Sequence, residues 1–461
     1  MNNCTEKVIY KSDDFRITLR DTGSDMLVVA FSPMNWPDQN KKDSYWGDSA
    51  ARKLPFSWLS IDAMAEHWFC DAKWLKIVEL VREVAQHFSI RIGYGHSMGG
   101  YAALKRSRDY YPQSVLAFSP QCSIHPDDVG SFDARYVKSF KPQFHQGMKL
   151  QSSDICARSF IFFDARFDID KEHALRILGV NISHISVGYV RHDAIFIAKG
   201  TISLTYLLML ALRNDAGSAQ EMQRYLRGQK KKSQIYFSHL VYKAFKNGHA
   251  RWAIDMADLA LHLDATNSRV ALVKLQACMR LNLKDEAKLV IDKMNMDSLS
   301  DGDIVVVANV MLALEQKERA LQIMESSSIA EGKNTKNLRA LANILLNEGA
   351  VSRAIKLLER AVILEPDDPH CLANLAKGLM RNKGTSTYDL PKAVALLKRA
   401  TEISPDVVTF WKSYAFALEV SGDVAAAFSV WRQIKNMTSI EGKDCMRFEA
   451  LQSMALGVTK R

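Results

Sequence analysis

The chain has 461 residues, enough for two or three domains, and its 48% hydrophobic and 24% charged residues exclude an extended disordered chain. A net charge of +10 fits a basic solvated surface. The one conspicuous lysine run, at 230–232, is too short to indicate a nucleic-acid site, and the sequence has no helix-turn-helix signature. No nucleic-acid partner is therefore predicted. Seven scattered cysteines, odd in number and never spaced as C-x-x-C, argue against a disulfide framework or a zinc ribbon and favour a reducing compartment.

The beginning of the sequence carries no apolar stretch of the kind found in secretory signals. The most apolar segment, 201–212, is too short to cross a bilayer and is interpreted as a buried helix that closes the first domain. We therefore expect a cytoplasmic protein without a membrane span.

The first domain is expected at 1–213, where short β-rich runs alternate with amphipathic helical patterns such as 72–87 and 98–110. Continuous apolar runs such as Phe-Ile-Phe-Phe are typical of strands buried on both faces. The alternation predicts a mostly parallel sheet flanked by helices. The expected strands are 7–10, 15–19, 26–32, 90–94, 115–118, 160–163 and 184–189.

The strands cease after a polar segment, 214–234, which is interpreted as a linker or connecting helix. In the region 235–461, alanines recur at steps of 34, 33, 34, 39 and 34 residues, and an insertion around 384–390 accounts for the longest step. The recurring alanines are Ala253, Ala287, Ala320, Ala354, Ala393 and Ala427.

This pattern resembles the tetratricopeptide repeat, in which small residues allow paired helices to cross closely. The resemblance covers roughly 233–438 and implies an all-α solenoid of about six helix pairs, because one pair cannot bury its apolar stripe alone. A protein or peptide partner in the groove of the repeats is the expected ligand.

The segment Gly-Tyr-Gly-His-Ser-Met-Gly-Gly-Tyr-Ala-Ala-Leu contains G-x-S-x-G between a predicted strand and a predicted helix. A serine on such a tight turn, Ser97 here, exposes its hydroxyl, and small neighbours leave room for the bend. This arrangement resembles the nucleophile turn of the α/β-hydrolase superfamily. The resemblance extends over about 5–213 and implies Ser97 as the nucleophile.

In that superfamily an acid and then a histidine follow the serine along the chain. His192, in a loop after the last predicted strand, matches the base; His184 and His173 remain alternatives, and His96 is expected to shape the pocket. Asp168 matches the acid turn after the strand at 160–163. Two neighbouring carboxylates, Asp170 and Asp164, stay open as alternatives, although Asp170 could instead cap a helix.

The oxyanion hole needs two donors. The backbone N–H of Met98 is expected to be the first, and Ser32 or Met34 the second, because Pro33 has no N–H; the side chain of Asn35 is a further alternative. Four tryptophans precede the nucleophile, and aromatic rings at a pocket mouth could stack on sugars or acyl chains, although most of these rings are expected to pack in the core. They are Trp36, Trp46, Trp58 and Trp68.

The sequence therefore predicts a serine esterase or acyltransferase fused to a repeat domain for protein binding, with a repeat scaffold carrying an inactive or accessory hydrolase domain as the alternative. No cofactor or metal site is expected, since the sequence has no H-E-x-x-H and no other ligand set. The nucleophile run, together with Ser-Pro-Gln at 119–121, is similar to that of hydrolase-plus-repeat proteins of bacterial surface-polysaccharide biosynthesis. That similarity suggests a small-molecule or glycan ester as the substrate.

Overall fold

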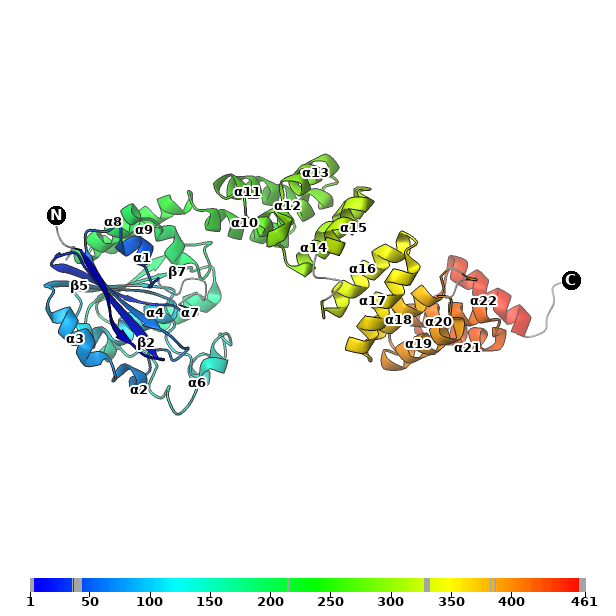
Figure 1. The fold of residues 1–461 in the computed structure, drawn as a ribbon, viewed down its shortest axis with the longest axis horizontal. Helices are drawn as coiled ribbons and strands as arrows, with labels where there is room; N and C mark the ends of the chain where they lie inside the picture. Colours follow the sequence, from blue (N-terminus) through cyan, green and yellow to red (C-terminus); the bar gives the residue numbers. More distant parts are fainter. Residues whose placement is uncertain are drawn as a thin grey trace. The chain divides into compact units, whose positions relative to one another are not determined.

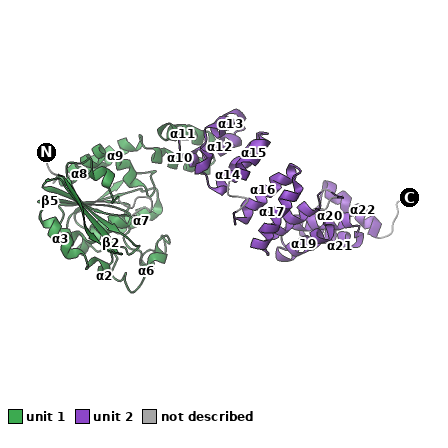
Figure 2. Ribbon diagram, viewed as in Figure 1, with its two compact units in different colours: residues 1–265 green, residues 266–461 purple. Residues whose placement is uncertain are grey.

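A computed structural model describes residues 4–34, 36, 44–213, 215–326, 332–381, 383–384 and 387–455. The chain divides into two compact units, residues 1–265 and 266–461 (Figure 2). The first unit contains a mixed sheet with its flanking helices and the first helix pair of the repeat region, and the second unit contains the remaining repeats.

The sheet of the first unit has eight strands in the order β1-β2-β4-β3-β5-β6-β7-β8. Helices surround this sheet (Figure 1). Pairing is antiparallel between β1 and β2 and between β2 and β4, and parallel from β4 across to β8. Parallel strands whose carboxyl ends meet at one edge create the usual place for a site in such a sheet. The strands are β1 (Thr5–Lys11), β2 (Phe15–Asp21), β3 (Met26–Phe31), β4 (Ser57–Ala63), β5 (Ile90–His96), β6 (Ser114–Phe118), β7 (Arg158–Phe163) and β8 (Ile182–Ser186).

Strand β4 was not predicted from the sequence, because its polar residues interrupt the apolar pattern. All seven of its residues are nevertheless buried. Asp62 accepts hydrogen bonds from Arg16 at 2.9 Å, from Ser60 at 2.8 Å and from the backbone N–H of Trp46 at 3.1 Å. A buried carboxylate that is fully hydrogen-bonded is compatible with a core position. The polar residues of this segment therefore did not exclude a buried strand.

Two apolar cores lie on opposite faces of the sheet. One contains residues of α3 and α4, and the other contains residues of α8 and α9. The helices of this part are α1 (Asp48–Ala51), α2 (Asp71–Trp74), α3 (Val78–Gln86), α4 (Met98–Lys105), α5 (Ser107–Tyr110), α6 (Pro126–Val129), α7 (Asp168–Arg176), α8 (Thr201–Leu212) and α9 (Ser218–Lys230), with 3-10 turns η1 (Val137–Ser139), η2 (Ser152–Asp154) and η3 (Ala194–Ala198). Helix α8 coincides with the apolar segment expected at 201–212.

Helix α9 occupies most of the segment interpreted as a linker or connecting helix. Its residues Met222 and Leu226 are fully buried in the core shared with α8, and the side chain of Gln223 donates to the carbonyl of Ser186 in β8 at 3.3 Å. The helix is therefore part of the sheet domain, and the expected boundary after residue 213 lies too early.

The repeat region is a series of six helix pairs followed by one more helix, within the residues that the structure describes. All six recurring alanines lie in the second helix of a pair and are fully buried, because a larger side chain there would push the paired helices apart. The pairs are α10 (Gln234–Lys246) with α11 (Ala250–Leu263), α12 (Ser268–Arg280) with α13 (Lys284–Lys293), α14 (Asp301–Ala313) with α15 (Lys317–Ser326), α16 (Thr335–Asn347) with α17 (Val351–Leu364), α18 (Pro369–Leu379) with α19 (Leu390–Ile403) and α20 (Val408–Ser421) with α21 (Val424–Met437); η4 (Met296–Ser298) precedes α14, and α22 (Gly442–Ala455) is last.

Candidate active site

Ser97 forms the turn between β5 and α4. Its backbone is held at φ 56° and ψ −122°, a conformation that is strained for any residue other than glycine. The turn is so tight that a Cβ on Gly95 would lie 2.2 Å from the carbonyl oxygen of Gly99, and a Cβ on Gly99 would lie 2.1 Å from the carbonyl oxygen of Phe31. The glycines at these two positions are therefore required by close backbone approach.

The hydroxyl of Ser97 lies 2.9 Å from Nε2 of His192, and Nδ1 of the same imidazole lies 2.8 Å from Oδ2 and 3.0 Å from Oδ1 of Asp170. The carboxylate fixes the tautomer in which Nδ1 carries the proton, so Nε2 accepts from the serine hydroxyl. Three groups from the carboxyl ends of β5, β7 and β8 thus form one hydrogen-bonded line, and the imidazole remains partly accessible while the carboxylate is buried.

The acid behind His192 is Asp170, and the prediction of Asp168 is wrong. Asp168 is the first residue of α7 and is exposed, whereas Asp170 lies two residues further along the helix and faces inward. The cap role considered for Asp170 is not observed either, because the position before the helix is occupied by Phe167.

Asp164, the other carboxylate considered, shapes the loop that carries the histidine. Its Oδ2 accepts from the backbone N–H groups of Val190 and Arg191, each at 2.8 Å, and its Oδ1 accepts from that of Arg166 at 2.8 Å. These bonds join the loop after β7 to the loop after β8. His192 follows directly, so its position depends on Asp164.

Behind Asp170 lies a partly buried polar network that the sequence did not reveal. Nη2 of Arg135 lies 3.3 Å from Oδ1 of Asp170. The same guanidinium donates hydrogen bonds to both carboxylate oxygens of Asp133, at 2.9 and 3.0 Å. His173 contacts Asp133 through Nε2 at 2.9 Å and accepts the backbone N–H of Cys122 through Nδ1 at 3.2 Å. Because both of its ring nitrogens are used in this way, His173 is not the base.

Charges within this network keep its carboxylates ionised. Burial alone would raise the pKa of Asp170, but the hydrogen bond and charge of His192 and the charge of Arg135 outweigh it and the pKa is lowered. Burial also acts to raise the pKa of Asp133. The hydrogen bonds from His173 and Arg135 outweigh this effect, and the pKa lies well below the usual range. Burial raises the pKa of the Cys122 thiol to about 11, so the Cys122–His173–Asp133 contact is not a second nucleophilic site.

Two other histidines remain to be placed. His184 is exposed, and its Nε2 contacts the carbonyl of Ala174 at 2.7 Å. His96 is buried, and its Nε2–H donates to the carbonyl of His192 at 2.9 Å. Burial lowers the pKa of His96 to about 4, which keeps this ring neutral. His96 thus holds the backbone of His192 in place, the pocket-shaping position expected for it.

The oxyanion donors are resolved in part. Met98 is the first residue of α4, where the backbone N–H has no acceptor within the helix. The N–H of Ser32 donates to the carbonyl of Ile61 at 3.2 Å, so it is not available to a substrate. The assignment of Met34 as the second backbone donor stays a prediction. Asn35 lies outside the described residues.

Two further side chains lie beside the Ser97 hydroxyl. Gln121, in the Ser-Pro-Gln run, is buried with its side-chain amide oxygen 3.4 Å from Oγ. Burial raises the pKa of Tyr136, and its hydroxyl interacts with Ser97. Nothing in the local sequence around Tyr136 indicated this position.

The tryptophans divide between core and site. Trp58 is fully buried and donates from Nε1 to the carbonyl of Trp46 at 3.1 Å. Trp36 and Trp46 contact each other with ring centroids 5.7 Å apart. Trp68 is buried but packs edge-on against Tyr136 at 5.2 Å, and so supports the tyrosine that reaches Ser97.

Among the described residues, no group of three histidine, cysteine or acidic side chains could hold a metal ion. In the same part of the chain, no helix has the length and apolar character needed to cross a membrane.

Searches against protein-family models and against curated proteins gave no match. The chain is similar in part to several solved structures. YrrB, a tetratricopeptide repeat protein with an unusual peptide-binding site, is 18% identical over 40% of this chain and 94% of its own, with a TM-score of 0.34. A tetratricopeptide repeat protein from Parabacteroides merdae is 12% identical over 50% and 86%, with a TM-score of 0.40. PilW, a type IV pilus biogenesis factor, is 13% identical over 48% and 98%, with a TM-score of 0.39. The region after the sheet domain is a series of helix pairs.

Proposed function

We propose that the chain is a serine hydrolase, an esterase or acyltransferase that works through an acyl-serine intermediate. The observation that carries the proposal is the continuous line from Oγ of Ser97 through His192 to Asp170, with separations of 2.9 and 2.8 Å. A serine hydroxyl is a weak nucleophile unless a base takes its proton, and an oriented, neutral imidazole is suited to that task.

In the proposed reaction, Oγ of Ser97 attacks the ester carbonyl carbon while its proton passes to Nε2 of His192. Asp170 stabilises the imidazolium that results. The N–H groups of Met98 and Met34 hydrogen-bond the negative oxygen of the tetrahedral intermediate. His192 then returns the proton to the leaving alkoxide, and an acyl-serine remains. Water or an acceptor hydroxyl releases the acyl group by the same steps in reverse.

The strand–serine–helix turn, the chain order Ser97, Asp170, His192 and the placement of all three at the carboxyl edge of the sheet support an α/β-hydrolase type of domain. A small-molecule or glycan ester remains the proposed substrate, from the similarity of the nucleophile run. A cytoplasmic location remains a proposal that fits seven cysteines without a disulfide framework.

For the helix pairs we propose binding of a protein or peptide, because stacked pairs of this kind present extended surfaces. The names of the solved structures reported above mention repeats, peptide binding or pilus biogenesis and no hydrolase. They are therefore closer to the alternative, a repeat scaffold whose sheet domain is inactive or accessory. Against that alternative stand the intact hydrogen-bonded line and the strained serine.

A fluorophosphonate probe tests the proposal, because it reacts only with an activated serine. The full-length protein should be labelled and Ser97→Ala should not. Ser89→Ala, at an exposed serine, serves as the matched control and should be labelled like the wild type. Equal labelling of the wild type and Ser97→Ala, or no labelling of either, would contradict the proposed hydrolase. It would support the alternative, a repeat scaffold with an inactive or accessory sheet domain.

A further inference from the structure

Two adjoining cavities of about 590 and 500 Å³ open at the carboxyl edge of the sheet. They share Ala165, Arg166 and Tyr189, so they form one depression, called here the basic cleft. Its walls come from the loops after β7 and β8 and from helices α9 and α10, all within the first unit. The lining residues are Asp164, Ala165, Arg166, Phe167, Ser186, Gly188, Tyr189, Arg191, Arg227, Lys230, His239, Tyr242, Lys243 and Lys246.

Six of these side chains are arginines or lysines, and none of them forms an ion pair with a carboxylate of the described residues, although ion pairs are common elsewhere in that part of the chain. Asp164 also lines the cleft, but both of its oxygens accept backbone N–H groups. Asp193, close by, contacts His239 at 3.3 Å. The cleft therefore has six basic side chains and one lining carboxylate, Asp164, so its net charge is strongly positive. The six cations are Arg166, Arg191, Arg227, Lys230, Lys243 and Lys246.

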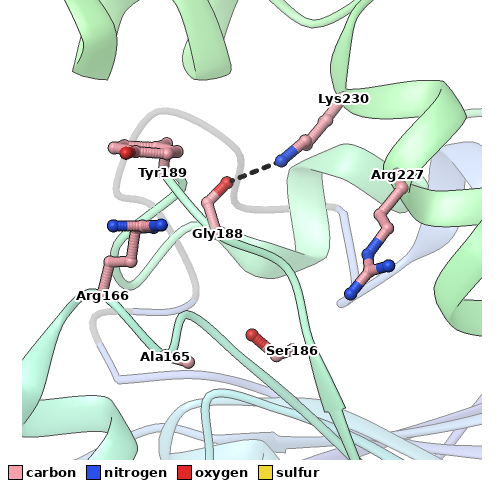
Figure 3. A pocket seen from close by; sticks show the side chains of 7 residues that line it. All are labelled: Ala165, Arg166, Ser186, Gly188, Tyr189, Arg227 and Lys230. Carbon is pink, nitrogen blue, oxygen red and sulfur yellow. Dashed lines mark hydrogen bonds between the residues drawn. The ribbon is translucent and has the colours of Figure 1, made fainter.

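Three of the cations, Arg166, Arg191 and Lys230, contact aromatic rings of the loops or helices around the cleft. Arg166 lies under the ring of Tyr189, 4.8 Å from its centroid, while Arg227 and Lys230 extend from α9 toward the same space (Figure 3). Lys230 donates to the carbonyl of Gly188 at 3.4 Å. Burial and neighbouring cations, Arg227 first, lower the pKa of Lys230, as expected where like charges are gathered.

The loop after β8 has a strained backbone at two residues that line the cleft. Tyr189 and Arg191 have positive φ, 66° and 50°, a costly conformation for such side chains. Asp164 maintains this conformation through its bonds to Val190 and Arg191. Tyr189 and Arg191, the two residues with this strained backbone, both line the cleft. His192 follows Arg191 directly in the chain. One strained loop thus serves both the cleft and the proposed active site.

We infer that the basic cleft binds a phosphate-type anion carried by the ester substrate, held by guanidinium groups and lysines beside the aromatic rings of Tyr189 and Phe167. Arginine forks and lysine ammonium groups are the side chains that bind phosphate oxygens most strongly. The identification of the anion as part of the substrate rests on the proposed function. Binding of the anion itself does not.

The first test measures binding of inorganic pyrophosphate to the full-length protein by calorimetry. The wild type should bind, and Arg166→Gln and Lys243→Gln should each weaken binding about tenfold, the effect of one charge-assisted contact. Arg224→Gln is the matched control, because Arg224 is an exposed arginine on α9 that lines neither cavity. Absence of wild-type binding, or an equal loss in Arg224→Gln, would overturn the inference.

The second test separates this inference from the proposed chemistry. Ser97→Ala should retain pyrophosphate binding, so the cleft can be tested even if Ser97 is not a nucleophile. With an active enzyme, the ratio of kcat/KM for a phosphonate-bearing nitrophenyl ester over that for nitrophenyl acetate should fall about tenfold in Arg166→Gln. An unchanged ratio would show that the cleft does not hold the substrate's anion.

Discussion

Nη2 of Arg135 lies 3.3 Å from Oδ1 of Asp170, and the same Nη2 and the neighbouring Nε donate to the two oxygens of Asp133. The acid of the proposed triad is therefore positioned by a chain of charged groups that ends at the backbone of Cys122. Burial of the carboxylates of Asp133 and Asp170 is tolerable because each contacts a histidine and the partly exposed guanidinium of Arg135.

We expect Arg135→Gln to lower kcat about tenfold, because one charge-assisted hydrogen bond to Asp170 is lost. Arg135→Lys should recover only part of that loss, since lysine keeps the charge but cannot form the two-pronged contact with Asp133. Ester turnover measured for the three proteins, with separate kcat and KM values, checks this. Full activity in the glutamine variant would show that Asp170 needs no support from Arg135.

The assignment of the acid is tested by a matched pair of substitutions on one helix. Asp170→Asn should reduce kcat by on the order of 10³ to 10⁴, because the amide no longer favours the correct tautomer of His192. Asp168→Asn should be close to the wild type, since Asp168 is exposed and stands away from the imidazole. The opposite ranking in an ester assay would restore the assignment made from the sequence.

The difference between these two aspartates shows what the sequence could and could not predict. Local order along the chain predicted Ser97 and His192, because a tight glycine-flanked turn and a loop after the last strand leave recognisable patterns. The exact start of α7 decides which carboxylate faces inward, and helix ends are the least predictable feature of a sequence. Hence Asp168 was preferred to Asp170.

The same limit explains the other differences. Strand β4 was missed because its buried Ser60 and Asp62 are balanced by Arg16 and Trp46, which lie far away in the sequence. The cations of the basic cleft come from four separate segments that are polar in isolation. Helix α9 has an apolar stripe too short to distinguish a packed helix from a linker. By contrast, the recurrence of six alanines in the sequence predicted the helix pairs without any long-range information. All six are fully buried in the structure.

The close backbone approach at the nucleophile turn predicts that alanine substitution has opposite effects on stability at two glycines, Gly99 and Gly228. Gly99→Ala should destabilise the first unit strongly or prevent it from folding, because the new Cβ would lie 2.1 Å from the carbonyl oxygen of Phe31. Gly228→Ala, on α9 with nothing within 4 Å of its Cβ position, should raise stability by about 0.5–1 kcal/mol. Thermal unfolding of the two variants provides the measurement. Equal effects would mean that the turn is looser than described.

The buried imidazole of His96 predicts a dependence of stability on pH. Its pKa is lowered from 6.5 to about 4, so between these values the unfolded chain binds a proton that the folded chain does not. The stabilisation is complete above pH 6.5 and declines as the pH falls toward 4. Since one pKa unit corresponds to about 1.4 kcal/mol, the decline attributable to His96 is about 3 kcal/mol.

The measurement must separate His96 from His67 and His145, whose pKa values are also lowered by burial. Thermal unfolding of the wild type and His96→Gln at pH 7 and pH 4.5 does so, because only the difference between the two proteins is attributed to His96. The variant loses the hydrogen bond to the carbonyl of His192 at both pH values, so it should be less stable at pH 7 but less sensitive to acid. Parallel declines in the two proteins would mean that His96 is protonated in the folded state, and the neutral donor proposed to hold His192 would then be an imidazolium.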